Sequence, residues 1–195
     1  MIRCLALLLT ACALWAIEPS ASAPAFTLTS ATGASVSLAD HRGKVVVLEW
    51  VNYDCPFVKK HYGAAGNMPA LQREWTGKGV VWLSICSSAA GKQGHFTGQA
   101  LTSRIAAEGA SPTAYLIDAD GTVGRAYAAR NTPYMVIIAA DGTVAYAGAI
   151  DSIRSTKAED VAKATNHVAV ALGELMAGKP VTTAKTAAYG CSVKY

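Results

Sequence analysis

The 195-residue sequence predicts a mixed α/β domain, with a central sheet, helices on both faces and an N-terminal β-hairpin. Three observations support this fold class. The runs Val45–Leu48 and Val80–Ile85 lack a polar face, as is typical of central strands that are buried on both sides. A segment with helical patterning follows each run. Further along the chain, two apolar runs flank Asp141-Gly142, a dipeptide typical of hairpin turns.

The individual elements follow from local signals. Residues 26–28 and 36–38 alternate apolar and polar side chains on either side of Gly33, which predicts the N-terminal hairpin. Pro56 is a favoured first residue of a helix, and the helical pattern continues from there toward Trp75. The other expected elements are a helix over residues 96–108, strands at 114–117, 134–138 and 143–147, and a last helix over 157–176.

Composition excludes several classes of protein. Hydrophobic residues make up 52% of the chain and charged residues 15%, so a disordered charged tail is excluded. The net charge of +4 comes from scattered basic residues without a Lys/Arg-rich run, so we expect no nucleic-acid partner. The length allows one domain of ordinary size. After the N-terminus, no apolar run reaches the roughly 20 residues of a membrane-spanning helix.

The N-terminus has the pattern of a secretory signal peptide, with a basic start, an apolar run to Ile17 and a small-residue exit. We expect cleavage near residues 21–23. Leu9–Cys12 offers an alternative as a bacterial lipobox with Cys12 as the lipidated residue, and an uncleaved anchor is a third interpretation. The first two place the protein in the periplasm or outside the cell. The predicted organisation is a signal peptide at 1–23, a domain at 24–180 and a C-terminal tail at 181–195.

Removal of this segment leaves three cysteines, Cys55, Cys86 and Cys191. Cys55 follows a buried strand and precedes Pro56, so it lies at the start of a helix. The unpaired N–H groups and the dipole of a helix start stabilise a thiolate, which is the nucleophilic form of cysteine. The neighbouring carboxylate of Asp54 would oppose this effect if it pointed the same way. The alternative is an inert core cysteine, but the position at a strand end favours a reactive thiol.

The order of elements, the Cys-Pro at a helix start and Thr132-Pro133 before a strand resemble a thioredoxin-fold redoxin. The sequence is similar to the alkyl hydroperoxide reductase/thiol-specific antioxidant group and to exported thiol–disulfide oxidoreductases, over residues 24–176. Segments 52–61 and 189–195 resemble a bacterial subgroup of exported redoxins. The resemblance implies a cis peptide at Thr132-Pro133 that faces the reactive cysteine, and an activity that reduces peroxides or protein disulfides with electrons from a thiol donor.

Two positions depart from the patterns of these relatives. Val58 occupies the position of the second cysteine of a Cys-x-x-Cys motif, so Cys55 has no partner on its own helix. Asn52 stands three residues before Cys55, where peroxiredoxins place Thr or Ser, which puts peroxidase activity in doubt. A second thiol must therefore come from a distant part of the chain. We favour Cys191, in a Gly-containing tail, over Cys86, at the end of the neighbouring strand.

Two charged residues are candidates for supporting the cysteine. Glu49 lies at the end of an apolar strand, at the position where thioredoxins bury an acid that exchanges protons with the thiols. Arg130 precedes Thr132-Pro133 and would favour a thiolate or bind an anionic substrate. For each, a solvated charge is an equally good interpretation.

Two other functional classes remain open. Cys55 and His61, with Cys86 or His95, would make a nitrogen–sulfur site for copper or zinc, although copper chaperones of this fold keep two cysteines near the helix start. A binding domain without catalysis is the other alternative. We expect no cofactor and no bound metal. Substrate, electron donor and oligomeric state are not predicted by the sequence.

Overall fold

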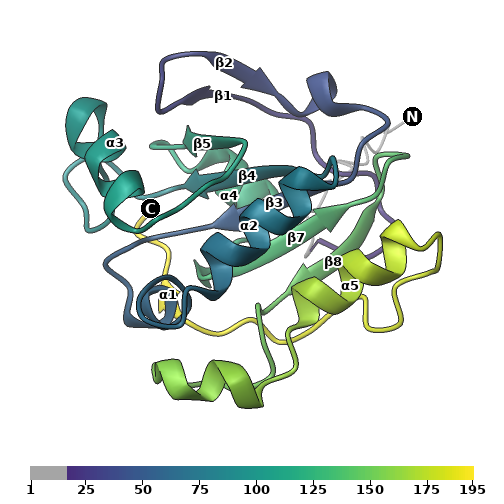
Figure 1. Cartoon of the computed structure of the whole chain (residues 1–195). Helices are drawn as coiled ribbons and strands as arrows, with labels where there is room; N and C mark the ends of the chain where they lie inside the picture. Colours follow the sequence, from purple (N-terminus) through teal and green to yellow (C-terminus); the bar gives the residue numbers. More distant parts are fainter. Residues whose placement is uncertain (1–16) are drawn as a thin grey trace, which may run out of the picture.

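The computed structural model describes residues 17–195 (Figure 1). Most of the predicted signal peptide, including Cys12 of the possible lipobox, lies outside the described residues. Residues 18–23 run along the sheet, where the Ser20 N–H donates to the Val144 carbonyl (2.8 Å) and the Val144 N–H donates to the Ala21 carbonyl (2.8 Å). None of the helices within residues 17–195 is long and apolar enough to span a membrane.

A seven-stranded mixed sheet forms the centre of the domain, in the order β2-β1-β5-β4-β3-β7-β8. The strands are β1 Thr27–Ser30, β2 Ser35–Ser37, β3 Val46–Trp50, β4 Val81–Cys86, β5 Ala114–Ile117, β7 Tyr134–Ile138 and β8 Val144–Gly148. Strands β3, β4 and β5 are parallel, whereas β7, β8 and the β1–β2 hairpin pair antiparallel. The predicted hairpin, both buried runs and the hairpin at Asp141-Gly142 are all present, so the predicted fold class is confirmed.

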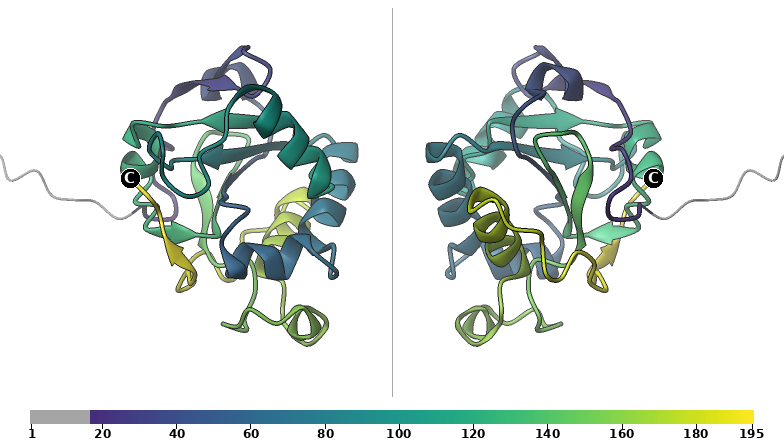
Figure 2. Two further views of the ribbon diagram at one scale, coloured as in Figure 1. Left: turned by 90° about the vertical axis from the view of Figure 1, so that its left-hand side faces the viewer. Right: turned by 90° about the vertical axis from the view of Figure 1, so that its right-hand side faces the viewer.

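The two faces of the sheet bury separate cores because successive side chains of a strand point to opposite sides. On one face, Val47 and Trp82 pack with side chains from α1, α2, α3 and α5. On the other face, Leu48 and Leu83 pack with Val123 of α4 and with the N-terminal segment. The helices are α1 Pro56–Tyr62, α2 Asn67–Gly77, α3 Gly98–Ala107, α4 Thr122–Ala126 and α5 His167–Met176. Figure 2 shows the sheet between these two layers.

Three features differ from the predicted elements. The helix expected from Pro56 toward Trp75 is two helices, because the chain turns at Gly63–Gly66, with Gly66 in the left-handed region (φ 55°). The expected last helix is a 3-10 helix, η2 Ala158–Lys163, followed by α5, which begins where the Asn166 side chain accepts the Ala169 N–H (2.9 Å). The short helix α4 and the two-stranded sheet formed by β6 Asn131–Thr132 and β9 Cys191–Ser192 were not predicted.

The C-terminal tail folds back over the domain. It pairs with β8 through the Ala147 N–H and the Ala184 carbonyl (3.0 Å), passes α1 (Figure 1), and ends against α4. Tyr195 at its end stacks on the Arg125 guanidinium, 4.2 Å from the ring centroid, and donates its hydroxyl to the Ala129 carbonyl (2.6 Å). The tail is therefore held on both sides of Cys191.

Candidate active site

Cys55 is the residue that immediately precedes α1, after the carboxyl end of β3. Its N–H donates to the Asn52 carbonyl (2.9 Å), and its own carbonyl accepts the N–H groups of Val58 and Lys59. The Cys55 side chain makes no hydrogen bond to the first turn of the helix. Cys55 thus lies at the amino-terminal end of α1, which is the positive end of the helix dipole.

Cys191 lies directly against Cys55. The two sulfur atoms are 2.7 Å apart, although 136 positions separate the residues in sequence. The Cys55 thiol also donates to the Thr132 carbonyl (3.2 Å). Strand β9 pairs with β6 so that Thr132 is opposite Cys191, and the Thr132-Pro133 peptide is cis, as expected from the family resemblance. Three distant segments therefore converge on one pair of thiols.

The two thiols differ in their surroundings. Cys55 is fully buried, whereas Cys191 is partly exposed. Burial raises the pKa of the Cys191 thiol to about 11, with a further contribution from the adjacent Cys55 sulfur. Cys191 therefore keeps its proton at neutral pH. The carboxylate of Asp54 pairs with Arg104 (2.9 Å), so a cation offsets the unfavourable charge considered from the sequence.

Glu49 is fully buried in β3 and accepts four hydrogen bonds. The donors are Tyr62 Oη (2.5 Å), Trp82 Nε1 (2.8 Å), Gln72 Nε2 (2.9 Å) and Ser84 Oγ (3.0 Å). Burial raises the pKa of Glu49, and the four hydrogen bonds oppose the shift. None of these four donors is Cys55. The Glu49 carboxyl group is therefore the centre of a polar network inside the core.

Two other predicted site residues, Asn52 and Arg130, contact the segments that flank the thiols. The Asn52 side chain accepts the Asp54 N–H (3.0 Å) and donates to the Gln93 carbonyl (3.4 Å), so it shapes the loop before Cys55. The Arg130 side chain is exposed and makes no hydrogen bond or ion pair with residues 17–195. Its carbonyl accepts the Val193 N–H (3.0 Å), which holds the tail beside β6.

Cys86 is buried at the end of β4, where its thiol donates to the Gly94 carbonyl (3.3 Å) and makes no hydrogen bond to Cys55 or Cys191. The described part of the chain contains no group of three metal-ligating side chains, so Cys55, His61 and either Cys86 or His95 do not gather into the site considered from the sequence. A cavity of about 420 Å³ lies between the segment around Ser22 and the loop at His41, and none of its lining residues belongs to the thiol site.

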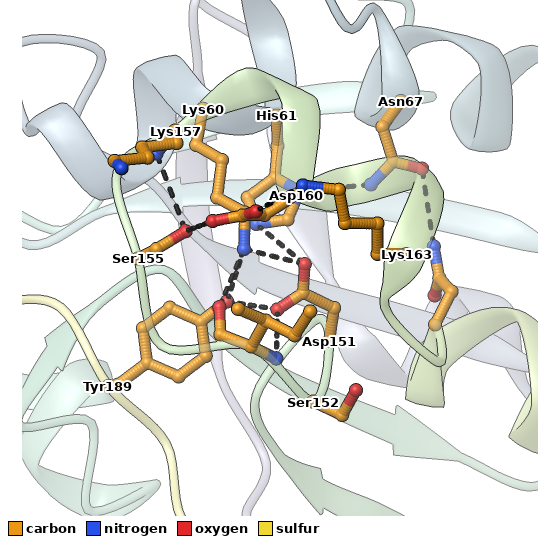
Figure 3. A network of polar contacts seen from close by, with 12 residues as sticks. Lys60, His61, Asn67, Asp151, Ser152, Ser155, Lys157, Asp160, Lys163 and Tyr189 are labelled. Atoms are coloured by element: carbon orange, nitrogen blue, oxygen red, sulfur yellow. Dashed lines mark hydrogen bonds and ion pairs between the residues drawn. The ribbon is translucent and has the colours of Figure 1, made fainter.

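Sequence reasoning missed a buried polar cluster next to the site (Figure 3). Lys60 and Asp151 form a buried ion pair (2.7 Å). The Tyr189 hydroxyl contacts both, two residues before Cys191. Lys60 follows Lys59 in a short helix and reads as a surface residue, so nothing in the sequence marks it as buried.

Comparisons with known proteins show the family and the fold of the chain. The AhpC/TSA family model matches residues 19–147, about two thirds of the chain. The chain belongs to the AhpC/TSA family. Two crystal structures are similar over most of their length. An uncharacterized conserved protein from Geobacillus kaustophilus is 27% identical, with a TM-score of 0.78 over 92% of this chain and 93% of that chain. A hypothetical protein from Sinorhizobium meliloti is 23% identical, with a TM-score of 0.75 over 92% of this chain and 96% of that chain.

The fold of this AhpC/TSA chain is thioredoxin-like. The thioredoxin domain of a thiol-disulfide oxidoreductase from Bacteroides vulgatus aligns with TM-score 0.55 and 18% identity, over 76% of this chain and 98% of that domain. No curated protein matches the sequence. The family match contains Cys55, Thr132 and Pro133 but ends well before Cys191, so the second thiol is a feature outside the matched part of the AhpC/TSA chain.

Proposed function

We propose that this protein is a thiol-dependent oxidoreductase in which Cys55 attacks the substrate and Cys191 resolves the product as an intramolecular disulfide. The observation that carries the proposal is the 2.7 Å separation of the two sulfur atoms in an AhpC/TSA chain that lacks a Cys-x-x-Cys motif. The two environments divide the roles. Cys55 lies at a helix start, which suits the attacking thiol. The raised pKa of Cys191 keeps this thiol protonated before the resolving step.

A small hydroperoxide is the first candidate substrate, because the Cys55 side chain is fully buried while the tail is docked, and a large substrate has no room to contact it there. The Cys55 thiolate would attack one peroxide oxygen and become a sulfenic acid, while the O–O bond breaks and the other oxygen leaves as an alcohol or water after taking a proton. Cys191 would then displace the sulfenic oxygen as water, forming the Cys55–Cys191 disulfide. Two electrons from a dithiol donor would restore both thiols.

Thiol–disulfide exchange with a protein partner is the second candidate, and the partial exposure of Cys191 favours it. In this reaction Cys55 attacks a substrate disulfide and releases one substrate thiol, and Cys191 then releases the other by attacking the mixed disulfide. A protein substrate would require the tail to move away from Cys55 first.

Single-turnover oxidation of the reduced protein tests the proposal. One equivalent of hydrogen peroxide, or of a small or protein disulfide, is added, and the products are identified by mass spectrometry after rapid alkylation. We expect a Cys55–Cys191 disulfide in the wild type and a trappable sulfenic acid or mixed disulfide on Cys55 in Cys191→Ser. The faster oxidant identifies the substrate class. A disulfide between Cys55 and Cys86 would assign the resolving role to Cys86 instead of Cys191. A Cys55 that reacts with none of these oxidants would support the binding-domain alternative.

The roles of Glu49 and Arg130 in this reaction remain predictions. Glu49 is proposed to influence proton exchange at the thiols through the buried network, and Arg130 to attract anionic substrates from its exposed position. Substitution of Arg130 by Ala should slow the reaction with anionic substrates and leave the rate with hydrogen peroxide unchanged.

We also propose that the protein acts outside the cytoplasm, in the periplasm or as a secreted or lipid-anchored protein. The proposal is supported by the signal-like N-terminal sequence. An oxidising compartment suits a pair of thiols that cycles through a disulfide.

A further inference from the structure

The buried cluster beneath the tail contains a full ion pair. Lys60 is 1% exposed, and its ammonium group donates to Asp151 Oδ2 (2.7 Å), to the Ile153 carbonyl (2.7 Å) and to the Tyr189 hydroxyl (3.2 Å). These three partners use all three N–H groups of a lysine. Asp151 in turn accepts the Tyr189 hydroxyl and the Ile153 N–H (3.1 Å). The Tyr189 hydroxyl therefore completes the hydrogen bonding of both charges (Figure 3).

Such a pair contributes little to stability by itself, since the cost of removing both charges from water offsets their attraction. A buried ionic cluster can instead define which partner group fits beside it. Here the partner is a single tyrosine hydroxyl from a tail that is otherwise rich in small residues. The Tyr189 ring also packs on Phe57, with the centroids 5.8 Å apart, so removal of the hydroxyl alone leaves an apolar contact in place.

The cluster joins the two halves of the thiol pair. Lys60 belongs to α1, the helix that begins after Cys55, and Tyr189 precedes Cys191 by two residues. Two residues of extended chain span at most about 7 Å, so fixing Tyr189 limits how far Cys191 can move. Figure 3 shows Tyr189 reaching from the tail to the Lys60–Asp151 pair.

We propose that Tyr189 is a positioning residue: its hydroxyl, bound between Lys60 and Asp151, holds the tail so that Cys191 stays against Cys55. This inference rests on the proposed function and specifies which residue positions Cys191 for the resolving step. The latch, defined as Lys60, Asp151 and Tyr189, raises the effective concentration of Cys191 at Cys55 without taking part in bond formation. It acts on the second step only, in which the Cys191 sulfur displaces water or a substrate thiol from Cys55.

Tyr189→Phe is the direct test, with Tyr127→Phe as the matched control. Tyr127 is also fully buried and loses one hydroxyl hydrogen bond, to the Pro24 carbonyl (2.6 Å), but it lies on the opposite face of the sheet. After one equivalent of hydrogen peroxide, Tyr189→Phe should form the disulfide about tenfold or more slowly, while oxidation of Cys55 keeps its wild-type rate. The effective concentration of Cys191, measured by equilibration with glutathione, should fall by a similar factor. The control should change neither value.

A second variant separates positioning from stability. Lys60→Met combined with Asp151→Leu replaces the ion pair by apolar side chains of similar size, a change that buried pairs tolerate. This double variant should fold and show the same slow resolution, and adding Tyr189→Phe should slow it no further, because the partners of the hydroxyl are already gone. A merely structural tyrosine would instead give an additional loss.

The possible failures are distinguishable. If Tyr189→Phe forms the Cys55–Cys191 disulfide at the wild-type rate and with the wild-type effective concentration, the latch is wrong and the proposed function stands. If the wild type itself forms no such disulfide, the proposed function is wrong and the latch with it.

Discussion

Gly190 lies directly against the carbonyl group of Thr132, and no other residue type fits there. A Cβ atom at position 190 would overlap the Thr132 carbonyl oxygen, and the backbone φ of +147° is one that L-residues rarely adopt. The same carbonyl accepts the hydrogen bond of the Cys55 thiol. The close approach of the tail to the cis-proline segment therefore depends on the absence of a side chain one residue before Cys191.

Gly190→Ala should consequently move Cys191 away from Cys55. We expect disulfide formation after one equivalent of oxidant to slow about tenfold or more, because the pairing of β6 with β9 is lost. Gly173→Ala in α5 is the control, since a Cβ there meets no atom within 4 Å and should stabilise the helix by up to about 1 kcal/mol. An unchanged rate of disulfide formation in Gly190→Ala would show that the tail tolerates a side chain at this position.

Cys55 should be the more reactive of the two domain thiols. In the Cys191→Ser variant at neutral pH, iodoacetamide should modify Cys55 at least about tenfold faster than Cys86, because only Cys55 lies at a helix start. Cys86 lies at the end of a strand and donates to the Gly94 carbonyl. Peptide mass spectrometry at successive times measures both rates. Faster labelling of Cys86 would mean that the active-site assignment is wrong.

Glu49→Gln should destabilise the domain by about 2–4 kcal/mol. In either orientation the amide would present its NH₂ group to a donor: to the Tyr62 hydroxyl at the Oε1 position, or to Trp82, Ser84 and Gln72 at the Oε2 position. Urea unfolding measures the loss, and Glu74→Gln, at an exposed helix position, should change stability by less than about 0.5 kcal/mol. The pH profile of Cys55 alkylation in Glu49→Gln tests the proton-exchange role separately: an unshifted profile would leave Glu49 with a structural role only.

His61 should make the domain sensitive to mild acid. Burial lowers the pKa of His61 to about 4 in the folded protein, where Asp151 opposes the shift and Lys60 adds to it. As the pH falls from about 6.5 to about 4, the unfolded chain binds a proton that the folded chain does not, so about 3 kcal/mol of stability is lost. His61→Asn keeps an acceptor for Asn67 but lacks this proton. Unfolding midpoints at several pH values should therefore fall more steeply in the wild type; parallel curves would contradict the prediction.

Export can be checked on the N-terminus of the mature protein. We expect it near residues 21–24, or at a lipidated Cys12, when the protein is recovered from the cell envelope and analysed by intact mass. Cleavage after residue 23 would remove the backbone contacts of Ser20 and Ala21 with Val144, so the mature domain must fold without them. Recovery of the full-length chain from the cytoplasm would argue against export.

Local patterns in the sequence predicted the strands of the central sheet and the position of Cys55 at a helix start. Strands and the Cys-Pro helix start depend on neighbouring residues, whose spacing and turn chemistry are visible in the sequence. The family resemblance, carried by Cys55, Pro56 and Thr132-Pro133, also lies in these local segments. The sequence did not predict where α1 ends, because the turn at Gly63–Gly66 interrupts a helical pattern that continues on both sides of it.

Only the tertiary structure decided which thiol meets Cys55, where Asp54 points and why Lys60 is buried. Each of these depends on contacts between segments that are far apart in the chain, and the periodicity of a segment carries no information about its distant partner. Cys191 and Cys86 were both plausible from their positions. The pairing of β9 with β6 places Cys191 at Cys55, while Cys86 is bound to the Gly94 carbonyl. A lysine in a short helix becomes a core residue only because Asp151 and Tyr189 arrive from elsewhere to satisfy its charge.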